Sequence, residues 1–402
     1  MMQRRAVILC FNASPTPRQQ NLFRLLRDMG WRPAYVTWER SGAAKTVPRG
    51  NGDYLAIIRL KAPTESARLL FAMPRYWREL SVVIRRVTRE EDAAPIIIAT
   101  HFFHLPLMRK LPSALWMYDA AEYFAFDMSR YLGSFSIIAY PLLAYLEGLG
   151  IRRMRAVLAV DSRGGWFETH LLRFNRAVRV VPNVPALADD PAPESVEKSA
   201  AEYAGRRVIC YVGGLMERKG LEAALDAIEL VRQDMPDILL LLIGPYRDDH
   251  SKLRELLNQR GLSDHIKVTG PLSYREMLVK ITGTEIGLAL HQRDPLYAKV
   301  GALNGRKIFT YMQAGLAVIA PKFGDIGRVV QETECGELVN TENPADISLA
   351  LKNLLLNDEL RLRFKRNGRR AFEQRYNWEA VARELKPWLL ECCVDLPGRE
   401  KS

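Results

Sequence analysis

A glycine turn followed by two adjacent cations is the strongest chemical feature of the sequence. The turn is Gly213 and Gly214, within the segment V-I-C-Y-V-G-G-L-M-E-R-K-G-L at residues 208–221, and the cations are Arg218 and Lys219. A turn after a buried strand offers backbone N–H groups to an anion, and the start of the next helix adds partial positive charge. Arginine can grip two phosphate oxygens, and lysine adds a mobile charge. The segment therefore predicts a site for a diphosphate.

A plainer interpretation of the same segment is a tight turn beside two solvated cations, because short motifs often occur by chance. Two better-known phosphate sites are excluded. The sequence has no G-x-x-x-x-G-K-[ST] loop, and no G-x-G-x-x-G follows its first strand. A diphosphate site here would therefore belong to another family.

The bulk composition is that of a globular protein with an excess of positive charge. The chain has 402 residues, of which 48% are hydrophobic and 26% charged, and its net charge is +12. That length exceeds one ordinary core and predicts two domains. The positive excess favours acidic partners, which include nucleic acid, an anionic membrane surface and phosphorylated substrates.

The five cysteines show neither an even count nor paired metal-ligand spacing. Cys10 and Cys210 lie within apolar strands, where a thiol is usually inert packing. We therefore expect a reducing, cytoplasmic compartment. The apolar run at 6–11 is too short for a signal peptide, and the longest uncharged stretch, 131–146, is shorter than the ~20 apolar residues that a membrane-spanning helix needs.

Strand-like apolar runs alternate with helical patterns along both halves of the chain. The runs lie at 6–11, 33–37, 54–60, 95–100, 114–118, 156–161 and 178–181 in the first half, and at 208–212, 238–243, 266–268, 286–290 and 317–320 in the second. Continuous apolar strands with intervening helices are typical of parallel sheets covered on both faces. The predicted fold class is α/β, with two tandem Rossmann-like parallel-sheet domains.

A change of composition separates the two domains. Residues 186–205 are rich in proline, acids and small residues without periodicity, which is typical of a linker. We expect an N-terminal domain at 1–185, a C-terminal domain at 206–376, and a helix within 377–402 that either packs on the second sheet or crosses back to the first domain. Ligands of open α/β sheets bind at the carboxyl ends of the strands, so we expect the site in a central cleft that both domains face.

Two helical segments of the first domain combine apolar and basic residues. Residues 68–89 carry arginines at helical offsets, and the segment 131–155 ends in I-R-R-M-R. A basic amphipathic helix can lie on an anionic membrane, or its apolar face can pack on its own domain. No helix-turn-helix, zinc-ligand set or aromatic RNA-binding motif accompanies the charge, so we expect no nucleic-acid binding.

A second stretch, K-V-G-A-L-N-G-R-K-I-F-T-Y-M-Q-A-G-L-A-V-I-A at 299–320, runs from a glycine-rich loop through a helix into a strand. Together with the Gly-Gly turn and the R-K-G, it resembles the donor domain of the retaining glycosyltransferases of family 4, which have the GT-B fold. The resemblance covers about residues 205–390 and includes the late F-E-Q-R-Y-N-W-E. In the first half, Y-D-A-A-E at 118–122 resembles the Y-D-x-H-E of one subgroup.

The resemblance implies roles for particular residues. Arg218 and Lys219 would bind the diphosphate of a nucleotide-sugar donor, and Asp119 and Glu122 are the polar groups on the acceptor side; these four form the expected catalytic set. For the last two, capping of the next helix is the alternative. The expected donor-binding set comprises Gly213, Gly214, Gly244, Pro245, Pro271, Leu272, Asn304, Lys307 and Thr310.

The resemblance also implies transfer with retention of the anomeric configuration, by front-face attack in which the leaving phosphate takes the acceptor proton. Such chemistry needs charge stabilisation of a leaving diphosphate more than it needs a nucleophile. No D-x-D motif occurs, so we expect neither a metal nor a cofactor. The Asp248-Asp249-His250 cluster is interpreted as part of a solvated loop.

Three positions depart from the family pattern. The glutamate of the family's F-E-Y is Thr310 here, its partner glutamate falls at Ala302, and the histidine of Y-D-x-H-E is Ala121. A hydroxyl thus replaces a carboxylate that accepts two bonds, and each lost charge-assisted bond typically costs ~1.5–3 kcal/mol. Asp294 and Asn304 are candidates to replace these contacts.

The sequence therefore predicts a hexosyl-type glycosyltransferase acting in the synthesis of a cell-envelope or extracellular polysaccharide or glycolipid. Its expected partners are a nucleotide-sugar donor, a saccharide or lipid-linked acceptor, and an anionic membrane surface on the cytoplasmic side. The three departures keep a second hypothesis open, an inactive GT-B protein that binds a partner glycosyltransferase or a glycan. A nucleotide-sugar epimerase and a nucleotide-dependent oxidoreductase are further alternatives, and the missing glycine fingerprint argues against the latter.

Overall fold

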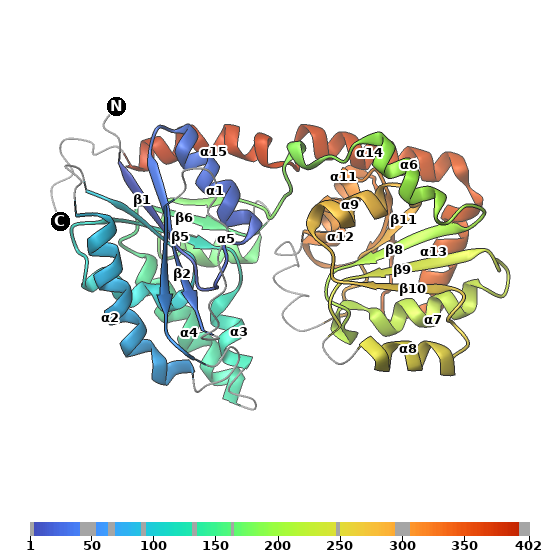
Figure 1. The fold of residues 1–402 in the computed structure, drawn as a ribbon, viewed down its shortest axis with the longest axis horizontal. Helices are drawn as coiled ribbons and strands as arrows, with labels where there is room; N and C mark the ends of the chain where they lie inside the picture. The colour runs from blue at the N-terminus through green and yellow to red at the C-terminus, as the bar shows by residue number, and fades with distance from the viewer. Residues whose placement is uncertain are drawn as a thin grey trace. The chain divides into compact units, whose positions relative to one another are not determined.

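Two parallel sheets, each in its own unit, organise the chain (Figure 1). The computed structural model describes residues 4–40, 54–62, 69–89, 94–130, 135–161, 165–246, 250–293 and 306–393. Unit 1 comprises Met1–Asn183 with Ala382–Ser402, and unit 2 comprises Val184–Val381. The predicted α/β class with two Rossmann-like sheets is confirmed.

Unit 1 contains a parallel sheet of seven strands within the described residues, in the order β3-β2-β1-β4-β5-β6-β7. Each of the seven strands predicted in this half is present. The strands are β1 (Arg5–Leu9), β2 (Arg32–Glu39), β3 (Tyr54–Arg59), β4 (Ile96–Ala99), β5 (Leu115–Ala120), β6 (Ala156–Ala159) and β7 (Val178–Val180). The helices are α1 (Pro17–Asp28), α2 (Leu69–Val87), the 3-10 helix η1 (Phe102–Arg109), α3 (Phe124–Arg130), α4 (Ser136–Ile151) and α5 (Trp166–Leu172).

Unit 2 contains a second parallel sheet, with six strands in its described part, in the order β10-β9-β8-β11-β12-β13. The strands are β8 (Arg207–Val212), β9 (Ile238–Ile243), β10 (Ile266–Gly270), β11 (Ile286–Leu288), β12 (Ala317–Pro321) and β13 (Gly336–Val339). The sequence reading missed β13, because its residues G-E-L-V form no continuous apolar run. The helical elements are η3 (Leu187–Asp189), α6 (Pro193–Ala201), η4 (Glu217–Lys219), α7 (Leu221–Val231), α8 (His250–Gln259), α9 (Tyr274–Thr282), α11 (Lys307–Gln313), α12 (Gly324–Thr333), α13 (Pro344–Leu356), α14 (Asp358–Gln374) and α15 (Trp378–Cys393).

The second sheet is buried on both faces, as its continuous apolar strands predict. Successive residues of β9 point into two different cores. Leu240 packs with side chains of α7, α8 and α13, whereas Leu241 packs with side chains of α9, α11, α12 and α14. Helices that pack on both faces hold the strands in place, and the carboxyl ends of the strands are the part of such a sheet where ligands bind.

The expected linker at 186–205 contains a helix and belongs to unit 2. Its helix α6 begins with Pro193 at the first position, where a missing N–H costs nothing. A Cβ on Gly283, at the end of α9, would lie 2.9 Å from the Cβ of Ala200, so the two helices are in close contact there. Beside them the Lys280 ammonium lies 3.0 Å from the Glu202 carboxylate.

Helix α15 contributes to both units. At its start the Trp378 N–H donates to the Pro185 carbonyl at 2.8 Å, within unit 2. From residue 382 it belongs to unit 1, where Leu385 and Leu389 are buried and the Arg4 guanidinium donates to the Cys393 carbonyl at 2.7 Å. Neither this helix nor any other among the described residues is long and apolar enough to cross a membrane.

Candidate active site

The site of unit 2 lies where the strand order of its sheet reverses. β8 has β9 on one side and β11 on the other, so the crossover connections leave in opposite directions at the carboxyl end of β8, the place where open α/β sheets bind ligands. The turns after β8, β9 and β10 run alongside one another there. The Gly213 N–H donates to Ile243 O at 2.9 Å, Leu215 N–H to Pro245 O at 2.9 Å, and Gly244 N–H to Gly270 O at 3.0 Å.

Glycine is required at this edge because two backbones touch. Gly213 and Gly244 have φ angles of 107° and 146°, which favour glycine. A Cβ on Gly244 would lie 2.1 Å from the Gly213 carbonyl oxygen, a separation that atoms cannot adopt. The predicted glycine turns are therefore brought together, and Pro271 and Leu272 continue the edge directly after β10. The N–H groups of Gly213 and Leu215 are already paired, so they are not among the open donors that the sequence predicted.

The R-K-G that follows forms a fixed cationic turn. Glu217–Lys219 is a single 3-10 turn that ends at Gly220, whose φ is 84°. The Tyr211 hydroxyl donates to the Lys219 carbonyl at 2.8 Å, which ties the turn back to β8. The Lys219 ammonium lies 3.6 Å from the position that a Cβ on Gly214 would take, so it reaches over the glycine turn. The side chain of Arg218 lies outside the described part of the structure.

A second lysine, Lys307, lies buried against the same turn. It is the first residue of α11, and only 9% of it is exposed. Its Nζ lies 3.7 Å from the centroid of the Tyr211 ring, and its Cε lies 3.7 Å from the position of a Cβ on Gly213. Nζ has no hydrogen-bond partner among the described residues. The aromatic face offsets part of the cost of burial, and no described acid balances the charge.

The electrostatics of Lys307 indicate a place for an anion. Burial holds the pKa of its ammonium well below the usual range, and repulsion by Lys219 lowers that pKa further. A bound phosphate would stabilise the Lys307 amine, which is buried beside a second lysine and has no hydrogen-bond partner among the described residues. This arrangement suits a diphosphate better than a neutral ligand.

Two tyrosines support this site, and the sequence reading missed both. Tyr211 holds the R-K-G turn and lies against Lys307. The Tyr311 hydroxyl accepts from the Val212 N–H and donates to Leu288 O, each at 2.9 Å, and so fixes the carboxyl ends of β8 and β11. Both rings are buried and lie on a strand and a helix at core positions, so the sequence alone did not distinguish them from packing residues.

Thr310, at the position of the family's glutamate, is 2% exposed and has a protein partner. Its Oγ1 lies 3.5 Å from the Tyr274 hydroxyl, which in turn donates to Gln313 Oε1 at 2.6 Å. Gln313 continues the chain of contacts to Asp190 Oδ1 at 2.9 Å. The hydroxyl therefore joins a network that fastens α11 to α9 and η3.

Asp119 of unit 1 has a role that the sequence reading did not predict. The reading expected an acceptor contact or a helix cap, whereas the structure shows a buried ion pair in which Arg18 Nη2 lies 2.7 Å from Asp119 Oδ1. Arg18 Nη1 also donates to Val181 O at 2.5 Å. The pair thus joins α1 to the carboxyl ends of β5 and β7. Glu122 is exposed nearby on the chain, just before α3.

A cluster of aromatic and histidine side chains lies at the strand-order reversal of unit 1, after β1 and β4. The His101 ring stacks on Phe11 with centroids 4.0 Å apart, and its centroid lies 4.2 Å from that of Phe124. The Arg40 guanidinium lies over the same Phe11 ring at 4.9 Å. Burial is the main cause that lowers the pKa of His101 well below its usual value, so this ring is neutral at pH 7. The Nδ1 atom accepts a hydrogen bond from the Phe103 N–H, and the lowered pKa makes the ring a weak proton acceptor but still a hydrogen-bonding group.

The next histidine of the cluster is structural. His104 is fully buried and shares a 3.0 Å hydrogen bond between its Nε2 and the Tyr76 hydroxyl, and burial lowers its pKa to about 3. The sequence reading missed this cluster although a signal was present. The letters T-H-F-F-H directly follow a predicted strand, at the end of the strand where open α/β sheets bind ligands.

Several expected residues lie outside the described part of the structure. These are Ala302 and Asn304, the candidate replacement Asp294, and Asp248 and Asp249. Among the described residues, no group of three or more His, Cys, Asp or Glu side chains is placed to hold a metal ion. The site as described therefore rests on Lys219, Lys307 and the glycine turns.

Comparison with known proteins places this site in a family. The family model described as glycosyl transferases group 1 matches residues 194–371. The phosphatidyl-myo-inositol mannosyltransferase of Mycobacterium leprae is 30% identical over 192 residues, which are 46% of this chain and 48% of that protein. Spore coat protein SA of Bacillus subtilis is 24% identical over 188 residues, 45% of this chain and 48% of that protein. In these matches the chain spans about half the length of the curated relatives.

Solved structures resemble the whole chain. Sucrose-phosphate synthase of Thermosynechococcus elongatus has a TM-score of 0.75 at 16% identity, over 97% of this chain and 99% of that one. HepE of Anabaena, in complex with UDP-glucose, has a TM-score of 0.69 at 14% identity, over 96% and 99%. Residues 194–371 are thus a domain of the glycosyl transferases group 1 family, and the predicted resemblance to the GT-B glycosyltransferases of family 4 is confirmed.

Proposed function

We propose that the chain transfers a hexose from a nucleoside-diphosphate sugar to an acceptor hydroxyl, with retention of configuration and without a metal ion. The observation that carries the proposal is the buried amine of Lys307, which faces the glycine turn of β8 beside Lys219 with no described anion to balance it. A leaving diphosphate supplies two negative charges at such a place. Preorganised cations that meet charge as it develops are a major source of catalysis.

The residues of unit 2 divide the work in this proposal. Lys219 and Lys307 would bind the diphosphate oxygens, together with Arg218 as the family resemblance implies. Tyr211 holds the turn that carries Lys219 and shields one side of Lys307. The Gly213 backbone would let the donor approach closely because it carries no Cβ, while Gly244 makes room for the Gly213 carbonyl. The leaving phosphate would then take the proton of the attacking hydroxyl.

The donor and the acceptor are proposed from the relatives and from unit 1. HepE is solved with UDP and with UDP-glucose, which supports a uridine donor, whereas the mannosyltransferase names favour a mannose donor. For the acceptor we propose a saccharide or a lipid-linked saccharide of the cell envelope, used at the cytoplasmic face of a membrane. The cluster of Phe11 and His101 lies at the ligand-binding edge of the sheet of unit 1, and the Nε2 atom of His101 would bond to a sugar hydroxyl there.

The test is calorimetric titration of the purified chain and of Lys307→Met with UDP, GDP and ADP. One nucleoside diphosphate should bind the wild type, and Lys307→Met should bind it at least ~10-fold more weakly, because a charge-assisted bond contributes ~1.5–3 kcal/mol. Without ligand the variant should be more stable than the wild type by about 1 kcal/mol, since a thioether replaces a buried amine without a described hydrogen-bond partner.

The matched control is Lys352→Met. This lysine pairs with Asp234, which precedes β9 at the amino end of the sheet, so the variant loses one positive charge far from the turn. It should bind the nucleotide like the wild type. Equal affinities for wild type and Lys307→Met, with both folded, would refute the diphosphate assignment.

One observation keeps a second candidate function in view, a GT-B protein that binds a nucleotide without transferring the sugar. The family's glutamate is replaced by Thr310, whose hydroxyl contacts Tyr274 within the protein. The two candidate functions are distinguished by incubating the chain with the nucleotide sugar that it binds and measuring the release of nucleoside diphosphate. Release of nucleoside diphosphate that depends on an added acceptor supports transfer, and binding without any turnover supports the second candidate.

A further inference from the structure

Helix α4 of unit 1 exposes an apolar stripe. Its outward residues follow one another at spacings of three and four along the helix, so they share one face. Ile138 is 76% exposed and Leu142 58%, values that leave most of each side chain in water. The stripe comprises Phe135, Ile138, Leu142, Tyr145, Leu146 and Leu149.

The stripe carries no acid. The one acidic residue of α4, Glu147, points the other way, where it is buried and accepts a hydrogen bond of 2.5 Å from the Tyr118 hydroxyl. Cations continue the same face instead, because Arg152 and Arg153 follow Leu149 at spacings of three and four. Both arginines are exposed. One face thus runs from apolar side chains to positive charge.

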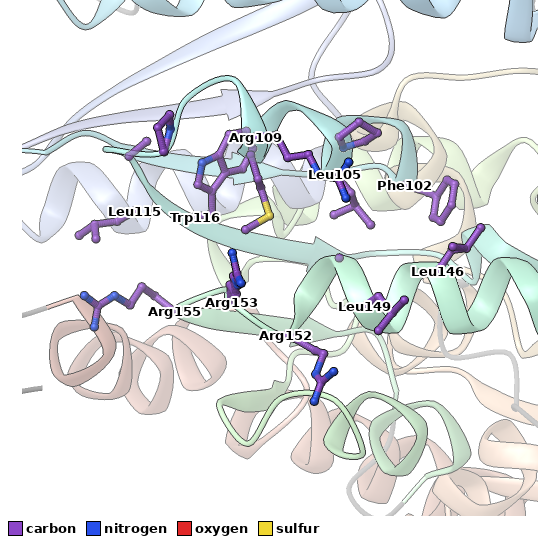
Figure 2. Close-up of a pocket in the computed structure, with 15 residues that line it drawn as sticks. Phe102, Leu105, Arg109, Leu115, Trp116, Leu146, Leu149, Arg152, Arg153 and Arg155 are labelled. Atoms are coloured by element: carbon purple, nitrogen blue, oxygen red, sulfur yellow. The ribbon is translucent and has the colours of Figure 1, made fainter. Parts of the chain in front are cut away.

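A groove of about 1080 Å³ lies between this face and the 3-10 helix η1. Figure 2 shows its two ends. Leu105, Phe102 and Leu146 line the end toward the tip of the strand arrow, while Arg109, Arg153 and Arg155 lie toward the other end, where β5 and β6 begin. No ion pair with Arg109, Arg152 or Arg153 is found among the described residues. The groove is therefore apolar at one end and cationic at the other.

Helix α2, the other basic amphipathic segment, is arranged differently. Its apolar residues Met73, Leu80 and Ile84 are buried within unit 1, while Arg85 and Arg86 are exposed. For α2 the interpretation that its apolar face packs on its own domain is therefore correct. α2 does expose Phe71 and Val82, but they lie eleven residues apart, whereas the exposed apolar side chains of α4 follow one another turn by turn. The sequence pattern did not distinguish these two arrangements.

We propose that α4 and its arginines seat the protein on an anionic phospholipid bilayer, with one lipid in the groove. A bilayer surface presents phosphates above acyl chains, which matches arginines beside an apolar stripe. In the groove the phosphate would meet Arg109 and Arg153, and an acyl chain would follow Leu105 and Leu146. A docked soluble protein would instead have to desolvate these arginines against acids of its own. The inference rests on the proposed function, because it brings the enzyme to a membrane-borne acceptor.

The test is co-sedimentation of the full chain with vesicles of phosphatidylcholine, with and without phosphatidylglycerol. The wild type should bind only the vesicles that contain phosphatidylglycerol. Arg152→Glu with Arg153→Glu should weaken this binding at least ~10-fold, since each basic residue near an anionic surface contributes ~1 kcal/mol. The matched control, Arg85→Glu with Arg86→Glu on α2, makes the same change in net charge and should have a clearly smaller effect.

A second pair of variants tests the apolar stripe. Ile138→Asn with Leu142→Asn should lose binding, whereas Leu349→Asn with Leu356→Asn, at comparably exposed positions of unit 2, should not. Equal effects of the two arginine pairs, or binding by the asparagine variants of α4, would overturn the proposal. A wild-type dimer that Ile138→Asn with Leu142→Asn converts to monomer would also overturn it, since the stripe would then cover a second copy.

Neither lipid test needs a donor or an acceptor. Titration of the wild type and these variants with UDP, GDP and ADP therefore reports on the proposed function separately. Vesicle binding that is lost while nucleotide binding persists supports the docking surface. If the wild type binds vesicles but no nucleotide, the result would contradict the proposed function and would not affect the proposal of the docking surface.

Discussion

The side chain of Lys307 occupies a position that lowers stability unless an anion is present. Its amine is buried against the Tyr211 ring, next to a second cation, Lys219, and no described acid lies within hydrogen-bonding distance. Sites of this kind persist where function requires them, because activity and stability are often in conflict. The family resemblance predicted that Lys307 binds the donor. The structure supplies a physical reason for this prediction, because the amine is buried and has no hydrogen-bond partner among the described residues.

Glu147 allows a prediction of pH dependence at the residue scale. Burial raises the pKa of its carboxyl to about 7, although the Tyr118 hydrogen bond opposes the rise. The folded state therefore holds a proton that the unfolded chain releases at its ordinary pKa of about 4.5. The stabilisation is complete at low pH and is lost as the pH rises through about 7, by at most ~3.5 kcal/mol at ~1.4 kcal/mol per pKa unit.

Urea unfolding of wild type and Glu147→Gln at about pH 5 and about pH 8 measures this effect. The wild type should lose stability between the two pH values, and the variant, whose amide does not titrate, should lose less. Glu79→Gln, at an exposed glutamate of α2, should behave like the wild type. An identical pH dependence in all three proteins would show that Glu147 is ionised in the folded state.

At the scale of elements, the R-K-G turn depends on the backbone of Gly220. A Cβ there would lie 2.0 Å from the Leu290 carbonyl oxygen, and the φ of 84° is strained for any other residue. Gly220→Ala should therefore destabilise the fold by more than the ~1–3 kcal/mol of backbone strain alone. It should also weaken nucleotide binding, because Lys219 would move with the turn.

Gly205→Ala is the matched control for this prediction. Gly205 has a similar φ of 79°, but nothing lies within 4 Å of its added Cβ, so only the backbone strain remains. Thermal unfolding and UDP titration of both variants separate two effects. Gly205→Ala reports the backbone strain alone, and Gly220→Ala reports the strain together with the close approach to the Leu290 carbonyl. If Gly220→Ala and Gly205→Ala lower the stability of the fold by the same amount and bind the nucleotide equally well, the contact with Leu290 does not hold the turn.

The elements also show where sequence patterns succeed. Every predicted strand is present, and most of them are continuous apolar runs in parallel sheets covered by helices, although β7 and β10 each include a basic residue. The pattern failed at β13, which is short and carries a glutamate, and at 186–205, where proline marks the start of α6 rather than a loop. It could not separate α2 from α4, because amphipathicity does not tell which face a helix buries.

At the scale of the whole molecule, the two units differ in how far the sequence could define their sites. The family model lies within unit 2, and there the motifs gave the glycine turns, Lys219 and Lys307. Unit 1 is recognised by its fold alone. Its Asp119 proved to be paired with Arg18, and the stacked rings of Phe11 and His101 became visible only when distant strands were brought together. The letters T-H-F-F-H do mark the end of a predicted strand, but no local pattern pairs His101 with Phe11 or Asp119 with Arg18.

The most direct test of the central claim is the count of protons taken up when the full chain binds its nucleoside diphosphate. The pKa of Lys307 is lowered in the free protein, and a bound phosphate should raise it, so in the pH range between these two pKa values binding should be accompanied by proton uptake. Calorimetry in two buffers of different ionisation enthalpy measures this number. We predict uptake by the wild type and by Lys352→Met, and its loss in Lys307→Met. Tight binding by the wild type without proton uptake at any pH at which the protein is folded would contradict a diphosphate held by the buried amine of Lys307.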